Sequence, residues 1–585
     1  MEEQGQESLP RDATKEEIET LSHESDKIPF TAWLLAFTGA AAQLTRFGIT
    51  VAWPENYLQN PPGDKTLPGA LDLGESKATI IQNSFLFFQY LTPMPFALLS
   101  DAWLGRYKTM LFSLGLMVIG YTVLFVTALP SSLEHKAGLG GLVATMILTG
   151  LGQGGLSAVM YPFIGDQIPE TNPTIKRNSK GKLVVTDRKL AIQYVFSGYY
   201  WMVNIAALSS IPTTFMEKYI GFWAAFLLPT CVLLVTIIPV IVWNKRLVKL
   251  PPQGNILPQA GRVLLIATSS KFHLSAALPQ YQIQHYNHSV PWNSSFIDEI
   301  RRGLKSCRVI ISFVVFWLCY NQTTNNLISQ AGQMQSPGIS NDTIQSLNAI
   351  ACIIMGPLIQ HTLSYFQRRK IPLGPILRMT IGFSFIAAGI GYAAGLQQLI
   401  YSRGPCYYYP LECAAARVPQ DSAQNINVQA NKVSVWLQTP LQFLLAIGEI
   451  LCLVSLSEYT YTEAPTNLKA LVQAFQAVAA ALGAAIGIGL GPVSRNPWLV
   501  IMFACLAGTM AITAVIFWVV FRSHDIDCAK ADVADAVDSV DRNENGGQRD
   551  DLEAVGCKKK TADVDSHHGE KSISSNAVKA VEVSL

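Results

Sequence analysis

Residues 220–243 read IGFWAAFLLPTCVLLVTIIPVIVW and contain no charged side chain. A helix needs about 20 predominantly apolar residues to cross the hydrocarbon core of a bilayer, so this run is long enough to span one. Lys245, Arg246 and Lys249 follow it closely. Because Lys and Arg are enriched in the cytoplasmic loops of membrane proteins, we expect this helix to end on the cytoplasmic side.

The whole chain has the composition of a membrane protein. Of its 585 residues, 50% are hydrophobic and only 14% are charged, whereas a soluble globular chain carries about 25% charged residues. The net charge of +2 gives no basis for binding nucleic acid. Residues 1–29 are polar and acidic, and the first apolar run is too long for a signal peptide. We therefore expect a multi-pass membrane protein.

Twelve windows of similar length and apolar character can be counted along the chain. They lie near 31–57, 79–100, 108–129, 141–163, 191–212, 220–243, 309–331, 344–366, 375–399, 433–456, 470–491 and 497–521. Pro93, Pro95 and Glu449 interrupt the second and tenth windows. Lys and Arg crowd the connections after the fourth, sixth and eighth windows, which predicts that both termini are cytoplasmic.

The longest internal connection lies between the sixth and seventh windows and divides the chain into two parts. The connections after the second and eighth windows are also faintly alike, LGRYKTM (104–110) beside LGPILRM (373–379). This layout favours an all-α membrane protein with the major-facilitator fold, in which about twelve transmembrane helices form two six-helix halves. The expected segments are a disordered cytoplasmic tail (1–28), the N-terminal half (29–243), a cytoplasmic loop (244–307), the C-terminal half (308–523) and a second disordered cytoplasmic tail (524–585).

The connection between the second and third windows reads SDAWLGRYKT (100–109). Gly105 permits a tight turn, and Asp101 can accept hydrogen bonds from Arg106 or from a helix N-terminus. We interpret Asp101, Gly105 and Arg106 as a latch that holds the two halves in one state of a transport cycle. The alternative is a basic turn that only obeys the positive-inside bias.

Several spans contain polar side chains. Arg46, in AAQLTRFGI (41–49), is the one charged residue between Lys27 and Glu55, and an arginine at the centre of a membrane helix costs roughly 2.5–3.5 kcal/mol. Glu449 is the obvious counter-ion within the spans. Neutral polar residues that share helix faces, or that cluster in the seventh window, are further candidates for substrate contacts or for bonds between helices: Tyr200 with Asn204, and Asn321, Gln322 and Asn325.

Motifs recur in one order along most of the chain. They are NYLQNP (56–61), PGAL (68–71), SDAWLGRYKT (100–109), YYWMVNIAAL (199–208), FIDEIRR (296–302), WLCYNQ (317–322), Glu449 and EYTYT (458–462). From about residue 30 to 523 the chain resembles the proton-dependent oligopeptide transporters, specifically their fungal peptide-transporter branch.

The chain departs from the family pattern at charged positions. In the family, the first helix carries Glu-x-x-Glu-Arg, but here the two glutamates are replaced by Ala42 and Thr45, and only Arg46 remains. The lysine of the fourth helix falls at Ser157, and the acidic residue of the seventh helix falls at Asn321. The resemblance therefore implies a substrate site rebuilt around fewer charges.

The resemblance also implies roles for the residues that remain. Arg46 is expected to bind a peptide carboxylate, because a guanidinium matches a carboxylate in shape and charge, and Glu449 is expected to attract the amino group. The resemblance adds Tyr90 to the substrate-binding set. Glu449 is also the main remaining candidate for proton coupling. The alternative is an Arg46–Glu449 ion pair that only fastens the halves together.

Other features concern the outer loops. Cys406 and Cys413 share the loop after the ninth window, where a disulfide can form. Asn341-Asp342-Thr343 is a glycosylation sequon in the loop after the seventh window. The remaining cysteines are dispersed without a metal-binding spacing, and no nucleophile or nucleotide-binding motif occurs, so we expect no metal, no cofactor and no enzymatic activity.

The function predicted from the sequence is secondary transport of short peptides or peptide-like molecules by alternating access across a lipid bilayer, in the plasma membrane of a fungus. Proton symport is expected to be weak. One alternative is a proton-independent facilitator or an exporter of a peptide-derived secondary metabolite. The other is a receptor that kept the carrier fold and binds a peptide without moving it.

Overall fold

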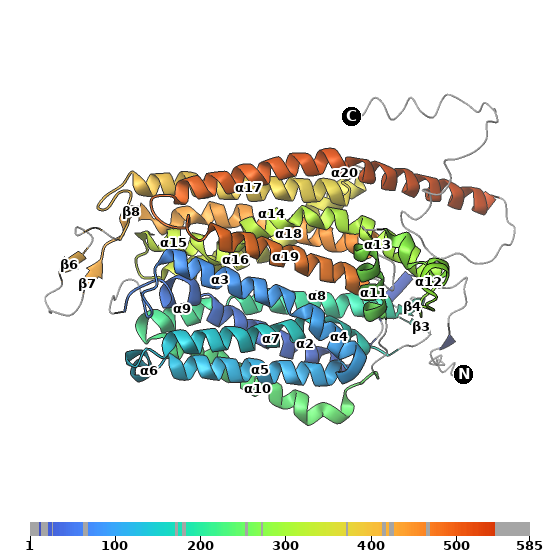
Figure 1. The fold of residues 1–585 in the computed structure, drawn as a ribbon, viewed down its shortest axis with the longest axis horizontal. Coiled ribbons are helices and arrows are strands. Elements are labelled where there is room, and N and C mark those ends of the chain that lie inside the picture. The colour runs from blue at the N-terminus through green and yellow to red at the C-terminus, as the bar shows by residue number, and fades with distance from the viewer. Residues whose placement is uncertain are drawn as a thin grey trace, which may run out of the picture. The chain divides into compact units, whose positions relative to one another are not determined.

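The computed structural model describes residues 11–12, 22–25, 27–62, 68–169, 174–177, 183–251, 256–270, 273–369, 373–411, 413, 417–419, 426–463 and 469–544. Contacts within the chain define two compact units, Met1–Asp525 and Ile526–Leu585. The first unit holds the helical bundle shown in Figure 1.

The first six windows fall on helices that share one hydrophobic core. This core includes Trp53, Tyr121, Phe163 and Phe226, all almost completely buried. The helices are α2 (Phe30–Thr50), α3 (Glu75–Leu91) with α4 (Pro93–Leu99), α5 (Arg106–Thr127), α7 (Gly138–Asp166), α8 (Arg188–Ala207) with α9 (Ser210–Tyr219), and α10 (Phe222–Val242).

Five of the last six windows fall on helices that share a second core, and the helix of the eighth window packs against that of the tenth. Phe313, Phe316, Phe383 and Phe503 lie at its centre, all fully buried. The helices are α14 (Phe313–Tyr320) with α15 (Asn326–Gly332), α16 (Ser346–Arg368), α17 (Pro375–Tyr401), α18 (Thr439–Glu463), α19 (Lys469–Leu490) and α20 (Leu499–Glu544).

Several predicted spans are interrupted. Within the described residues, seven helices are long and apolar enough to cross a membrane. The second window breaks at Pro93, which begins α4, because proline has no backbone N–H to continue the helix. The seventh window breaks at the 3₁₀ turn η5 (Asn321–Thr324). There the Thr323 and Thr324 hydroxyls donate to the carbonyls of Tyr320 and Asn321 at 2.8 and 3.1 Å, in competition with the helical pattern.

The connection predicted over 244–307 is helical. It contains α11 (Ile256–Ser269), α12 (Pro279–Tyr286) and α13 (Ser294–Ile311), which lie at the same end of the bundle in Figure 1. A small core of its own holds these helices together around Trp292, whose indole N–H donates to the carbonyl of Ala277 at 2.9 Å.

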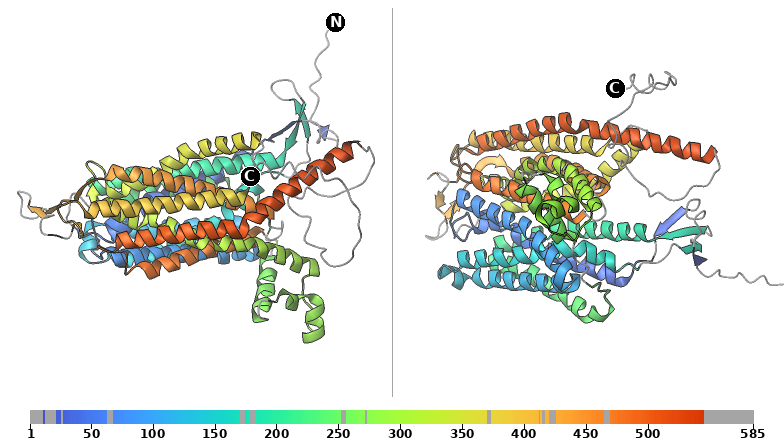
Figure 2. Two further views of the ribbon diagram at one scale, coloured as in Figure 1. Left: turned by 90° about the horizontal axis from the view of Figure 1, so that it is seen from above. Right: turned by 45° about the vertical axis from the view of Figure 1, so that its right-hand side comes forward.

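The structure describes short parts of the two tails. In the N-terminal tail, β1 (Arg11–Asp12) and β2 (Ser22–Ser25) pair with β3 (Thr174–Arg177) and β4 (Leu183–Asp187) in a four-stranded sheet of order β1-β3-β4-β2. At the other terminus, α20 extends to Glu544, beyond the predicted span (Figure 2).

Two pairs of helices bring the halves together. The α19 helix packs along α3, and α16 packs against α8. A site shared by both halves can therefore include side chains from six helices: α2, α3, α8, α14, α16 and α18.

Candidate substrate-binding site

Arg46 lies on α2, within the helical bundle, and contacts two residues of its own helix. Its Nε donates to Oε1 of Gln43, one turn earlier, at 2.8 Å, and its guanidinium lies 4.1 Å from the centre of the Phe47 ring. The side chain is half-buried. Arg46 therefore keeps donors that its own helix does not use, because a guanidinium has five N–H groups.

Four tyrosines lie within electrostatic range of this guanidinium: Tyr90 on α3, Tyr121 on α5, Tyr199 on α8 and Tyr320 on α14. Tyr320 comes from the C-terminal half, so the tyrosine cluster extends across the interface. A phenol can both donate and accept a hydrogen bond, which lets these groups adapt to a bound polar molecule.

Glu449 lies on α18 among neutral side chains. Tyr320, Cys352 and Asn348 are within hydrogen-bonding reach of its carboxylate, and the Cys352 thiol lies 3.6 Å from Oε2. Arg46 and Glu449 are both described by the structure, and no ion pair joins them. The direct ion pair, which was the alternative to substrate binding, is not formed in this conformation, and Tyr320 is a side chain within electrostatic range of both charges.

The amides of the seventh window have different partners. The Tyr90 hydroxyl donates to Asn321 Oδ1 at 3.4 Å across the halves, while Asn321 Nδ2 is buried without a partner in the described structure. Gln322 is held inside its own half, with its amide donating to the Leu318 carbonyl and its Oε1 accepting from Asn326. Asn321 therefore fits a substrate contact, and Gln322 supports the shape of the broken helix.

Asn325 takes part in contacts between the halves. Its Oδ1 accepts from the Thr79 hydroxyl at 3.3 Å, and its Nδ2 is buried without a partner among the described residues. Asn326 Oδ1 accepts from the same hydroxyl at 3.1 Å. These contacts join α3 to the start of α15.

Tyr200 and Asn204 share one face of α8. The Asn204 amide donates to the Tyr200 carbonyl at 2.9 Å. Tyr200 is within electrostatic range of Glu449, on the opposite half, yet 48% of its surface is exposed. The interface is therefore not fully closed beside Glu449.

The predicted latch does not join the halves in this conformation. Gly105 adopts a positive φ of 76° at the turn into α5, as the motif requires. Arg106 forms an ion pair with Asp166 and donates to the Pro162 carbonyl, and both partners belong to α7 of the same half. The side chain of Asp101 lies outside the described residues.

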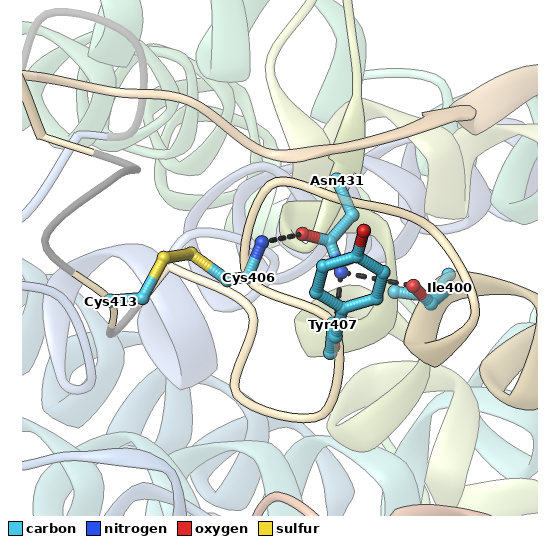
Figure 3. Close-up of a disulfide and its surroundings, with 5 residues drawn as sticks. All are labelled: Ile400, Cys406, Tyr407, Cys413 and Asn431. Carbon is cyan, nitrogen blue, oxygen red and sulfur yellow. Dashed lines mark hydrogen bonds between the residues drawn. A yellow bond between two sulfur atoms is a disulfide. The ribbon is translucent and has the colours of Figure 1, made fainter.

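The end of the bundle that the sequence predicts to face outward, called the outer end below, carries the connection between α17 and α18, where Cys406 and Cys413 form a disulfide (Figure 3). Asn431 braces this loop: its Oδ1 accepts from the Cys406 N–H at 3.1 Å, and its Nδ2 donates to the Ile400 and Tyr407 carbonyls. The disulfide lies away from the polar site and organises a loop.

Polar contacts between the halves gather at this outer end. The Ser329 hydroxyl donates to Glu75 Oε1 at 2.7 Å, the hydroxyls of Ser210 and Ser346 lie 2.7 Å apart, and Lys218 Nζ donates to the Ile339 carbonyl at 2.6 Å. The hydroxyls of Thr214 and Thr343 are also 2.7 Å apart. The structure thus has a closed outer end.

The glycosylation prediction at Asn341 is not compatible with this structure. Asn341 is 1% exposed, and its side-chain nitrogen, the atom that would carry the sugar, is buried. The sequon lies in the turn that closes the outer end, so an attached sugar has no space there. A sequon identifies the residue types but not the accessibility of the loop.

Sequence reasoning missed several members of the site. They are Tyr121, Tyr199 and Tyr320, which lie within electrostatic range of Arg46 on three different helices. The sequence signal that could have identified them is a tyrosine within a predicted span. Asp166, the partner of Arg106, ends α7 and carried no spacing that pointed to it.

The two helical halves, with a polar site between them, define a secondary membrane transporter of the major-facilitator fold. A family model described as "POT family" matches residues 107–502. The chain belongs to this family of transporters, and the predicted family and fold class are confirmed.

Individual relatives agree with this assignment. A protein named "Peptide transporter PTR_A" from Candidozyma auris is 35% identical over 534 residues, which cover 91% of this chain and 88% of that protein. "Probable peptide transporter ptr2" from Schizosaccharomyces pombe is 36% identical over 516 residues, covering 88% and 81%. The crystal structure of the POT family transporter PepTSo is 18% identical, with a TM-score of 0.66 over 86% of this chain and 99% of that chain, which supports the fold.

Proposed function

We propose that this protein transports short peptides or peptide-like molecules by alternating access between its two halves. The observation that carries the proposal is the placement of Arg46 and Glu449. Each lies among neutral polar side chains, on opposite halves, and neither neutralises the other by a direct ion pair. A zwitterionic peptide offers a carboxylate and an ammonium that complement these two charges.

The names of the relatives support the same substrate class, since the homologous proteins from Candidozyma auris and Schizosaccharomyces pombe are named as peptide transporters. We propose the plasma membrane as the location, where uptake of external peptides would occur. Arg46 would bind the substrate carboxylate, Glu449 the amino group, and Tyr90, Tyr200, Asn204 and Asn321 would supply hydrogen bonds.

The substrate class can be tested by thermal stabilisation of the purified protein. We expect di- and tripeptides with free termini to raise the melting temperature, because a ligand that binds only the folded state stabilises it by mass action. The same peptides with an amidated C-terminus or an acetylated N-terminus serve as matched controls and should stabilise less. Equal stabilisation by free and doubly blocked peptides would contradict the proposed roles of the two charges.

A further inference from the structure

An aromatic groove lies at the outer end of the C-terminal half, beside the loop that the Cys406–Cys413 disulfide closes. Its volume is about 490 Å³, and four aromatic side chains line it: Tyr401 at the end of α17, Tyr408 and Tyr409 in the loop, and Trp498 just before α20. Ligand pockets in proteins have volumes of roughly 300–1,000 Å³, so the groove is large enough for a small organic group. Its lining residues are separate from those of the polar site between the halves.

The groove lies where two membrane spans reach the outer end. One span ends at Tyr401 and the other begins at Leu499. The two helices, α17 and α20, pack side by side, with the ring centres of Phe383 and Phe517 5.1 Å apart (Figure 1). The groove is therefore at the level of the lipid headgroups, where Trp and Tyr are enriched because one part of each side chain is apolar and the other is polar.

One side of the groove continues into the lipid-facing surface of α20. Val500 and Ile501 line the groove, and Ile501 is more than half exposed. Ile512 and Val519 follow about three and about five turns later on the same face of the helix, and both are also more than half exposed. Because lipid tails are as apolar as these side chains, an acyl chain that lies along this face of α20 reaches the groove.

The groove is held in shape without a ligand. In the disulfide loop, Asn431 Nδ2 donates to the Tyr407 carbonyl at 3.1 Å, directly before Tyr408. The ring centres of Tyr401 and Tyr408 lie 5.5 Å apart, and the Tyr401 hydroxyl donates to Asn496 Oδ1 at 2.6 Å. These contacts join the end of α17 to the loop on one side and to the residues before α20 on the other. A ligand therefore binds at a small cost in ordering the protein.

The rings of the groove suit a quaternary ammonium group. The face of an aromatic ring attracts cations, and groups of aromatic rings recognise choline-type ammonium ions in this way. Tyr408, Tyr409 and Trp498 are each about half exposed, so their ring surfaces are accessible to a ligand. Within the described residues the lining contains no carboxylate. A trimethylammonium group, which has no N–H to satisfy, therefore fits better than a primary ammonium.

Two cationic residues are close in sequence to the lining. Arg403 comes two residues after Tyr401, Arg495 comes two residues before Pro497, and both arginines are exposed. A guanidinium complements a phosphate in shape and charge. The side chain of Glu412, in the disulfide loop, lies outside the described residues. Rings and arginines together complement a headgroup that carries both a quaternary ammonium and a phosphate.

We propose that the aromatic groove binds a choline phospholipid of the outer leaflet. The trimethylammonium group lies against the rings of Tyr408, Tyr409 and Trp498, and the phosphate lies toward the two arginines. An acyl chain follows the lipid-facing side of α20 from Ile501. The occupant is a membrane lipid and not a soluble choline compound, because the groove continues into the lipid-facing surface. This binding is independent of the proposed peptide transport.

The test compares phosphatidylcholine with phosphatidylglycerol of the same acyl chains, which has a phosphate but no cation. The full chain is purified in detergent, and native mass spectrometry measures the dissociation constant of each lipid for the native protein and for variants of the groove. In Trp498→Leu and in Tyr408→Leu we expect binding of phosphatidylcholine to weaken by about fivefold, because one ring face is lost. Binding of phosphatidylglycerol should change by less than about twofold, because it has no cation for the rings to attract.

Two controls separate the role of the ring from an effect on the fold. Trp498→Phe keeps an aromatic face and should keep most of the affinity for phosphatidylcholine. Trp436→Leu makes the same change as Trp498→Leu at another half-exposed tryptophan, which lies just before α18 and outside the lining, and should leave the affinity unchanged. The melting temperature of each variant without added lipid checks that it is folded.

Equal weakening of both lipids, or unchanged binding of phosphatidylcholine in both leucine variants, would overturn the proposal. Equally tight binding of glycerophosphocholine, which has the headgroup without acyl chains, would also overturn it, because the ligand would then be a soluble compound. A loss of sterol binding in Trp498→Leu, with phosphatidylcholine unaffected, would assign the groove to a sterol instead.

Discussion

Replacing Arg46 with alanine is expected to weaken binding of peptides that bear a free carboxylate by roughly 100-fold, or about 2.7 kcal/mol. The reason is that the peptide carboxylate, removed from water in the site, loses the guanidinium as its partner. Amidated analogues should lose much less. The protein should still fold and reach the membrane, because the hydrogen bond and the ring contact of Arg46 are with Gln43 and Phe47 of the same helix. The measurement is the inhibition constant of each peptide pair in the native protein and the variant.

Arg46→Lys is the matched control for this prediction. A lysine keeps the charge but not the planar fork of donors, so it should restore binding only in part. An equal loss for acids and amides would show that Arg46 acts on the structure of the site and not on the substrate carboxylate.

A second large effect is expected at Glu449 when a pH gradient drives uptake into proteoliposomes. Full coupling to one proton would give about tenfold accumulation per pH unit, since one pH unit corresponds to about 1.36 kcal/mol. We expect less than this in the native protein, because the family's acidic positions are Ala42, Thr45 and Asn321 here. We expect any accumulation that does occur to disappear in Glu449→Gln.

The reason lies in the neighbours of Glu449. Tyr320, Cys352 and Asn348 are neutral, so a change in its protonation breaks no ion pair in this conformation. Exchange of peptide at equal pH on both sides is the control for folding of the variant. Strong accumulation that survives Glu449→Gln would contradict the assignment of proton coupling to Glu449.

The positions of the helices could be predicted from the sequence because each span is a long apolar run. Such a run is either buried in the bundle or exposed to lipid. The window 375–399 corresponds to α17, Pro375–Tyr401, and 108–129 corresponds to α5, Arg106–Thr127. The break in the seventh span was harder to predict. Its amide and hydroxyl side chains were visible in the sequence, but their bonds to the backbone depend on the local turn.

Contacts between distant segments could not be predicted from one sequence. Asp101 lies five residues before Arg106 in the same motif, yet Arg106 pairs with Asp166, at the end of another helix. The hydroxyls of Thr214 and Thr343 lie far apart in the sequence and meet because α9 packs against the turn η6 (Asn341–Gln345). Residue types indicate which bonds are available, and the fold decides between the partners.

The most direct test of the proposed function is counterflow in proteoliposomes at equal pH on both sides. Vesicles loaded with unlabelled dipeptide are diluted into a trace of the labelled dipeptide, and protein-free vesicles and vesicles with Arg46→Ala serve as controls. A carrier that alternates between its two open states will accumulate the label transiently, and the Arg46→Ala vesicles will accumulate far less of a free-acid dipeptide. Binding of the dipeptide to the native protein without any counterflow would contradict transport and indicate a receptor on the same fold.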